Sequence, residues 1–264
     1  MDDKEESPKE FELGIEQKLK GDVIGDTMYT QRFVLTTLLK LKNPKWDKAL
    51  EDDLCFLWDS TLEKQVCEYL MEIDFPSIAC CVILEYNTLE YGRLIEILVG
   101  ILANISTAIC QIPLKNEQID TILNLLTSTD SLILIQVMRF IVAYYYSNPA
   151  FLTCDRAEDI SHLFKFVFRS STNFDLVQKT LEALAKITIN FKENMFFDSE
   201  IVQLSLKACV RLLTEDYEND FELFSSDQRS SAKYLVEYIM NFCVHTNQVE
   251  SLLSKMLKTV QNCI

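Results

Sequence analysis

Apolar and polar residues alternate at helical spacing along most of this chain, and three segments in its middle share one order of residue types. In each segment two apolar residues precede an alanine, and a polar or aromatic residue follows it. The alanines stand at positions 103, 143 and 185, which are 40 and 42 residues apart. A small residue at the same place in each copy lets neighbouring helices approach closely. The pattern predicts a series of repeated amphipathic helices.

Each of these helices is followed by a break in the pattern and by a second amphipathic helix. The apolar residues of the second helices fall within 119–126, 160–167 and 201–213. A fourth copy is predicted at Tyr234–Val244, because Leu235 corresponds to Leu181 once the polar segment 215–226 is set aside. That segment is predicted to be an acidic loop and a candidate site for a basic partner. Its acidic residues are Glu215, Asp216, Glu218, Asp220 and Glu222.

The spacing of the copies lies near the period of armadillo and HEAT repeats. We therefore predict an all-α fold, an armadillo/HEAT-like helical-repeat superhelix of about five repeats, in a single domain over residues 21–264. Each repeat alone would leave an apolar face bare, and stacking the repeats buries that face. Residues 1–20 are acidic and are predicted to form a disordered tail.

Local signals indicate where the first helices begin. The two glycines and small polar residues of Gly21–Thr30 predict a shaped turn before the first helix. Ser60 and Glu63 match a capping box that would open a helix. Asp74 precedes a further helix with Pro76 in its first turn, where the missing N–H of proline is tolerated.

The segment Ile97–Leu114 has eighteen residues without a charge, which is the lower limit for a membrane span. It contains Asn104 and Gln111, however, and it carries the pattern of its repeat. We interpret it as a buried repeat helix.

The composition narrows the possible partners. The net charge is −15, which would repel the phosphates of nucleic acid and an anionic membrane surface. Such a surface favours basic partners or simply keeps the protein in solution. The nine cysteines are irregularly spaced without a C-x-x-C pair, and the adjacent Cys80 and Cys81 are interpreted as core thiols. Reduced thiols, and an amino terminus without a signal peptide, predict a nuclear and/or cytoplasmic location.

No catalytic pattern is found. The chain has no glycine-rich phosphate loop and no Gly-x-Ser-x-Gly turn, and its two histidines, His162 and His245, lie far apart. We therefore expect no enzymatic activity, no cofactor, no metal site and no small-molecule substrate. Trp58 lies where one predicted helix ends, and we interpret it as a core plug in preference to a binding hot spot.

Several stretches, taken in order, resemble the serum-amyloid-A-like family of animal proteins. The stretches are GDVIGDTMYT at 21–30, EDDLCFLWDSTLEKQV at 51–66, the Pro76 turn, LVGILANIS at 98–106 and SSTNFDLV at 170–177. The resemblance implies an armadillo-like scaffold, nuclear or nucleocytoplasmic, that is associated with promoting cell proliferation. It implies no enzymatic activity and no particular ligand.

A second resemblance is to peptide-binding armadillo proteins, in which an asparagine of each repeat lines a concave groove and bonds the peptide backbone. Asn104 stands at that position, and the corresponding places hold Tyr144 and Lys186. In the fourth copy Asn241 lies one step away. Those proteins repeat the asparagine in successive repeats, whereas this chain has one clear asparagine at that position. The binding of nuclear-localisation signals in the manner of importin-α is therefore not favoured.

We predict a protein–protein interaction scaffold whose concave face, near Asn104, Tyr144 and Lys186, accepts a partner segment. At least one of the three successive tyrosines at 144–146 must reach the surface, since three neighbours cannot share one face of a helix. The alternative is a nucleocytoplasmic transport or chaperone-like adaptor that holds basic clients on its acidic surface. An enzyme with an unrecognised site and a subunit of a larger complex also remain open.

Overall fold

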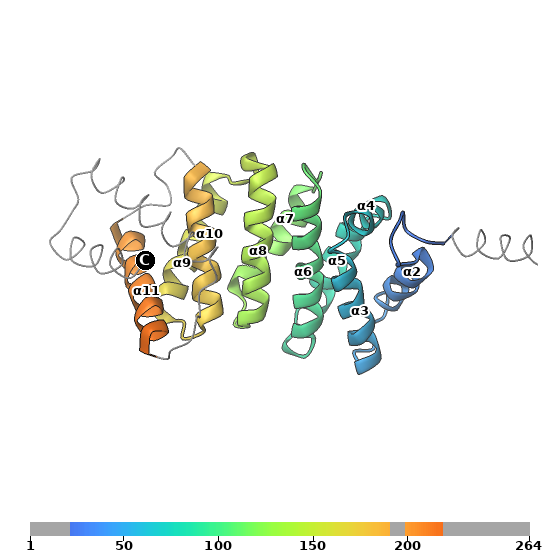
Figure 1. Cartoon of the computed structure of the whole chain (residues 1–264), viewed down its shortest axis with the longest axis horizontal. Coiled ribbons are helices and arrows are strands. Elements are labelled where there is room, and N and C mark those ends of the chain that lie inside the picture. The colour runs from blue at the N-terminus through green and yellow to red at the C-terminus, as the bar shows by residue number, and fades with distance from the viewer. Residues whose placement is uncertain (1–21, 191–198, 219–264) are drawn as a thin grey trace, which may run out of the picture. The chain divides into compact units, whose positions relative to one another are not determined.

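The chain is helical throughout the parts that the computed structural model describes, residues 22–190 and 199–218 (Figure 1). Strand-type pairing in these ranges is limited to one isolated bridge between Val23 and Thr30. The predicted tail 1–20, the fourth copy at Tyr234–Val244 and Asn241 lie outside the described residues. The chain divides into two compact units, Met1–Cys110 and Gln111–Ile264. In any repeat stack each layer contacts chiefly its neighbours, so a division into two compact units does not decide whether the chain forms one domain. The single domain over 21–264 therefore stays a prediction.

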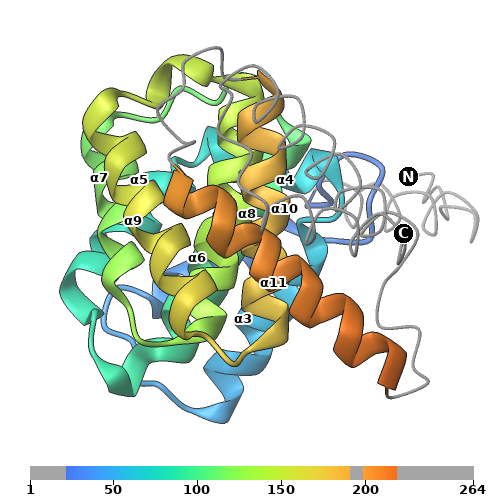
Figure 2. The ribbon, with the colours of Figure 1, turned by 90° about the vertical axis from the view of Figure 1, so that its left-hand side faces the viewer.

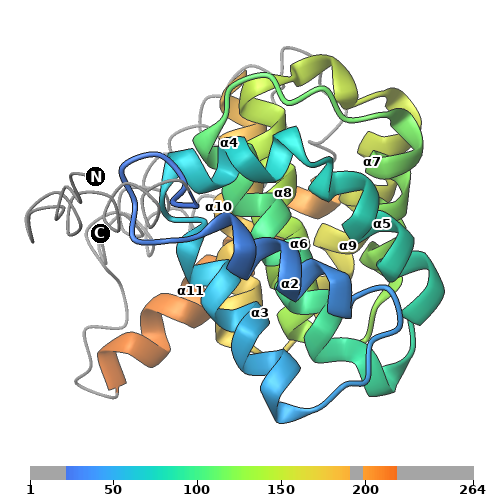
Figure 3. The same ribbon diagram turned by 90° about the vertical axis from the view of Figure 1, so that its right-hand side faces the viewer.

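The first unit is built around one central helix. Helices α3, α4 and α5 all pack on α6, and α2 packs on α3 (Figure 3). Fourteen of the seventeen residues of α6 are buried. A helix that is apolar on all sides is expected to be enclosed by protein, as this one is. The elements are α2 (Gln31–Lys40), α3 (Lys48–Ser60), α4 (Lys64–Glu72), α5 (Phe75–Tyr86), the 3₁₀ turn η1 (Leu89–Tyr91) and α6 (Gly92–Ala108).

This placement confirms that the charge-free segment beginning at Ile97 is a buried repeat helix as far as Ala108. Among the described residues, no helix combines the length and the apolar character that a membrane crossing requires.

Side chains at the helix starts explain most of the boundaries in this unit. Thr30 caps α2 by accepting a hydrogen bond from the N–H of Phe33, and Asp47 caps α3 in the same way. Asp74 precedes α5 as predicted, but it lies in the left-handed region at φ 56° and its side chain makes no cap. The predicted capping box at Ser60 is wrong. Ser60 is the last residue of α3, and its hydroxyl donates to the carbonyl of Leu57.

The predicted turn before the first helix is present. The N–H of Ile24 donates to the carbonyl of Tyr29 at 2.8 Å, which closes the turn. Gly25 has φ +55°, and a Cβ at this position would overlap the side-chain amide of Gln65. The oxygen of that amide accepts a hydrogen bond from the N–H of Asp26 at 2.9 Å. Glycine tolerates both the positive φ and the close approach of Gln65, so the turn packs against α4 at Gly25.

Trp58 packs against α6 at Gly100. A Cβ at Gly100 would overlap the indole ring at Cζ2 and Cε2, so the two helices approach at a residue without a side chain. The guanidinium of Arg93 lies 5.9 Å from the centre of the indole, within cation–π range. Arg93 also pairs with Glu51 on α3 and with the buried Glu96. The interpretation of Trp58 as a plug between helices agrees with this contact.

The second unit contains two longer helix pairs. Helices α8 and α10 lie side by side, while α9 and α11 pack on one another (Figure 1). Figure 2 shows α11 crossing over α9 and α10, both of which it contacts. The elements are α7 (Asn116–Leu123), the 3₁₀ helix η2 (Asn124–Thr127), α8 (Ser131–Ser147), the 3₁₀ turn η3 (Pro149–Phe151), α9 (Cys154–Ser170), α10 (Phe174–Asn190) and α11 (Ser199–Glu218).

The repeat inferred from the alanine spacing is present in the structure. Ala103, Ala143 and Ala185 each lie late in a seventeen-residue helix, and the next α-helix along the chain after each is α7, α9 or α11. The all-α, armadillo-like helical-repeat fold is therefore confirmed.

The acidic segment predicted to be a loop over 215–226 begins inside a helix. Helix α11 continues to Glu218, so Glu215, Asp216 and Glu218 are helical positions and a loop at 215 was wrong. The helix therefore extends beyond the run of Leu and Val residues and includes the first acidic residues after it. Asp220 and Glu222 lie outside the described residues.

Replacing Gly100 by Ala should destabilise the protein. In an ordinary helix this change stabilises by about 1 kcal/mol, but here the new methyl group meets the indole and overpacking costs about 1–3 kcal/mol. Urea unfolding followed by circular dichroism measures the difference. In a double-mutant cycle with Trp58→Leu, the smaller side chain should remove the penalty of Gly100→Ala. A stabilised Gly100→Ala variant would contradict the packing.

Burial predicts which thiols react in the folded protein. Desolvation raises the pKa of Cys67, Cys80 and Cys209 to about 12, so almost none of these thiols is ionised at pH 8. Cys81 and Cys110 are exposed, so the interpretation of Cys81 as a core thiol was wrong, whereas Cys80 is buried as expected. Iodoacetamide should therefore label Cys81 and Cys110 in the native protein, and the three buried thiols only in denaturant. Peptide mass spectrometry reads out the sites, and equal labelling of Cys80 and Cys81 would show that the buried assignment is wrong.

Candidate protein-interaction site

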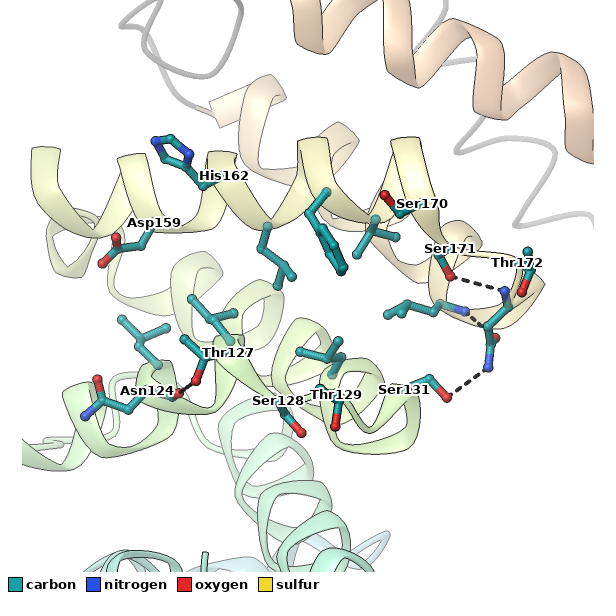
Figure 4. Close-up of a pocket in the computed structure, with 18 residues that line it drawn as sticks. Asn124, Thr127, Ser128, Thr129, Ser131, Asp159, His162, Ser170, Ser171 and Thr172 are labelled. Carbon is teal, nitrogen blue, oxygen red and sulfur yellow. Dashed lines mark hydrogen bonds between the residues drawn. The ribbon is translucent and has the colours of Figure 1, made fainter. Parts of the chain in front are cut away.

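An open groove of about 690 Å³ lies in the second unit. Helix α9 forms one wall, and η2 with the start of α8 forms the other (Figure 4). The loop between α9 and α10 closes one end. The floor is apolar and consists of Leu123, Leu126, Leu134, Leu163, Phe166, Val167 and Leu176.

The rim of the groove is polar but almost uncharged. Figure 4 shows hydroxyl groups along the edge formed by η2 and the start of α8 and at the loop end, whereas Asp159 and His162 lie on α9 at the other end. The uncharged rim residues are Asn124, Thr127, Ser128, Thr129, Ser131, Ser170, Ser171, Thr172 and Asn173. Hydroxyl and amide groups of this kind form hydrogen bonds in either direction.

Asn173 fixes the closed end of the groove. Its amide nitrogen donates to the hydroxyl of Ser131 at 3.0 Å, which joins the loop to α8. Its carbonyl oxygen accepts from the N–H of Leu176 at 3.0 Å and so caps α10. The guanidinium of Arg211 on α11 donates to the carbonyl of Ser171 at 3.0 Å. Three helices therefore hold this short loop, which gives the groove a defined end.

Phe166 is the most accessible apolar residue of the floor. Its side chain is 61% exposed, whereas its helical neighbours Leu163 and Val167 are buried. A large aromatic ring that borders an open groove presents apolar area to water at a place that a partner can cover.

The other end of the groove is acidic. Asp155, Glu158 and Asp159 lie in the first turns of α9, and all three are exposed. The imidazole of His162 lies 3.6 Å from the carboxylate of Glu158. This end therefore favours a positive charge beside the apolar floor. Among the described residues, no three His, Cys, Asp or Glu side chains gather as a metal site would require.

The residues predicted to line a concave groove lie in different environments. Asn104 is only 9% exposed, and its amide donates to the hydroxyl of Thr61 at 2.8 Å. Tyr144 is 4% exposed and stacks on Phe140. Burial raises the pKa of the Tyr144 hydroxyl above its usual value. These two side chains are core residues and give a partner no accessible surface.

The remaining predicted residues are partly accessible. Lys186 is exposed and donates to the carboxylate of Glu182 at 2.6 Å. Of the three successive tyrosines, Tyr145 is buried and Tyr146 is 80% exposed, which confirms that one of them reaches the surface. Trp58 keeps partial exposure at the edge of its packing contact with α6.

The groove of Figure 4 was not predicted from the sequence, although the sequence carries a signal for it. Two runs of hydroxyl residues, 127–129 and 170–172, stand 43 residues apart, close to the repeat spacing. Each run is followed by a helix cap, Asp130 for α8 and Asn173 for α10. The same turn therefore recurs in two consecutive repeats, and the two copies border one groove.

Repeated helix pairs that border an open groove are typical of helical-repeat proteins. The chain is similar to Protein saal1 of Danio rerio, at 29% identity over 205 residues, which covers 70% of this chain and 43% of that protein. It is also similar to Protein SAAL1 of Homo sapiens, at 26% identity over 191 residues, which covers 63% of this chain and 40% of that protein. These relatives confirm the resemblance to the serum-amyloid-A-like family. The chain spans less than half the length of the curated relatives it matches.

No protein-family model matches the chain. Among solved structures, it is similar to a designed armadillo repeat protein in complex with the peptide (KR)4, at 11% identity and a TM-score of 0.45, covering 86% of this chain and 98% of that one. A second designed armadillo repeat protein aligns at 13% identity and a TM-score of 0.47, with the same coverage of both chains.

Replacing Thr61 by Val should destabilise the first unit. The change keeps the shape of the side chain but removes the hydroxyl that accepts from the amide of Asn104 and donates to the carbonyl of Trp58, which costs about 1–3 kcal/mol. Thr61→Ser keeps the hydroxyl and serves as the matched control. Urea unfolding measures both variants. If Thr61→Val is no less stable than Thr61→Ser, the hydrogen bond between Thr61 and Asn104 has no structural role.

Proposed function

We propose that this chain is a non-enzymatic protein-interaction scaffold and that the groove between α9 and η2 binds an extended segment of a partner protein. One observation carries the proposal: an apolar floor with an exposed phenylalanine, Phe166, is bordered by uncharged hydrogen-bonding groups along η2, at the start of α8 and in the loop before α10. Apolar pockets of this size with a few polar groups around them are the usual binding sites of proteins.

The chemistry of the groove indicates what the segment contains. Backbone N–H and C=O groups of an extended segment suit a rim of hydroxyls and amides, because both sides donate and accept. Alternate side chains of such a segment point the same way, so two apolar residues separated by one other would reach the floor together. A basic residue would lie at the end beside Asp159.

The biological setting comes from the resemblance. We propose that the scaffold acts in the nucleus or the cytoplasm and in the promotion of cell proliferation, as the family resemblance implies. The alternative, an adaptor that holds basic clients on its acidic surface, is favoured by the acidic first turns of α9. The two functions differ in their response to salt, since screening weakens exposed charge pairs more than buried apolar contacts.

A short synthetic peptide tests the groove directly. We expect acetyl-Leu-Ser-Leu-Ser-Arg-amide to shift the methyl NMR signals of Leu123, Leu163 and Val167 in the whole chain. Phe166→Ala should weaken binding about fivefold or more, since truncation of an aromatic anchor costs about 1 kcal/mol or more. Tyr146→Ala is the matched control, because it removes an exposed aromatic ring outside the groove.

The peptide also separates the two functions. Asp159→Asn should weaken the arginine peptide but leave a version with glutamine in place of arginine unchanged. Binding that disappears at high salt and is insensitive to Phe166→Ala would favour the acidic-surface adaptor. Equal effects of Phe166→Ala and Tyr146→Ala would contradict the groove as the binding site.

A further inference from the structure

A second accessible surface lies on the neighbouring helices α8 and α10. The outward positions of α8 follow helical spacing and include Leu132, which is 48% exposed, and Tyr146, which is 80% exposed. Ile135, Arg139 and Val142 lie between them and are half-buried. On α10, which packs beside α8, Lys179, Glu182 and Lys186 are half-buried or exposed. We call the outward residues of these two helices the α8–α10 face.

This face carries an excess of positive charge, although the chain as a whole carries −15. Arg139 is the single charged residue of α8. Lys179 and Lys186 donate to the same carboxylate, that of Glu182, at 2.9 and 2.6 Å. Asp175, in the first turn of α10, is the other acidic residue of these helices. Three cations therefore face two carboxylates, and Glu182 is shared between both lysines.

The charges of the cluster act on one another. Burial alone would raise the pKa of Glu182, but the hydrogen bonds from Lys186 and Lys179 lower it below its usual value. Burial lowers the pKa of Arg139, and the field of Glu182 opposes that change. The carboxylate of Glu182 thus interacts with cations from both helices, and the cations of the two helices outnumber their carboxylates by three to two.

We propose that the α8–α10 face binds an acidic segment of a partner protein. A carboxylate of the segment pairs with Lys179 and Lys186 beside Arg139, and an apolar side chain covers Leu132 or Tyr146. Charge complementarity selects this occupant, because the cations are grouped here and exposed apolar residues lie on the same side of α8 as Arg139. The site is distinct from the groove between α9 and η2 and takes a partner of opposite charge.

Fluorescence anisotropy of a labelled peptide tests the proposal on the whole chain. The probe is Glu-Leu-Glu-Gly-Glu-Leu, and its counterpart with glutamine at every glutamate should bind at least about tenfold more weakly. Lys186→Glu should weaken the acidic peptide by about tenfold, because a like charge replaces its partner. Lys207→Glu is the matched control, since it makes the same change of net charge at an exposed position of α11.

Glu182→Gln gives the opposite sign and excludes a loss of fold as the explanation. Removing the carboxylate that both lysines share should tighten binding of the acidic peptide several-fold, whereas a damaged fold would weaken it. Circular dichroism confirms that each variant is folded. Equal effects of Lys186→Glu and Lys207→Glu, or weaker binding by Glu182→Gln, would overturn the proposal. The groove peptide should bind the Lys186→Glu variant normally, so this proposal and the groove fail independently.

Discussion

The contact between Trp58 and the backbone of α6 at Gly100 determines how the first unit is assembled. The indole reaches the helix only because residue 100 has no side chain, and this close approach brings α3 against the central helix. The same approach places Thr61, just after α3, within 2.8 Å of Asn104. Dispersion contacts of a large ring and one buried hydrogen bond therefore act on the same pair of helices. Loss of either would loosen the helix on which α3, α4 and α5 pack.

The stretches that resemble the serum-amyloid-A-like family lie where helices and turns contact one another. The stretch 51–66 meets the stretch 98–106 through Trp58 and Gly100, and it meets the turn at 21–30 through Gln65 and Gly25. The stretch 170–177 supplies Asn173, which caps α10 and ties it to α8. These residue types are needed for close packing and capping, so the stretches account for the fold and say little about a partner.

The sequence predicted the repeat and its helices because the apolar period is a property of each helix by itself. The side-chain environments at single positions depend on neighbouring helices, and there the sequence misled. Tyr144 aligns with a groove position, yet it packs between Phe140 and Phe151 and its hydroxyl donates towards the carbonyl of Ile112 at 3.5 Å. Ser60 looks like an N-terminal cap, but it is the last residue of α3. The groove also depends on Phe166 of α9. Whether this side chain is exposed is decided by how neighbouring repeats pack, which the pattern of its own helix does not reveal.

Net charge says little about which segment binds at a given face, because screening limits the reach of distant charges. At physiological ionic strength the Debye length is about 8 Å, so a bound segment responds to the few charges beside it and hardly to the sum over the chain. On the α8–α10 face those charges are Arg139, Lys179 and Lys186 with a shared carboxylate, and at the end of the groove they are the carboxylates of α9. Under the two proposals, one helical-repeat unit selects an acidic segment on one face and a basic segment on another. A chain of net charge −15 is not restricted to basic partners, because each face of a repeat protein is a local electrostatic environment.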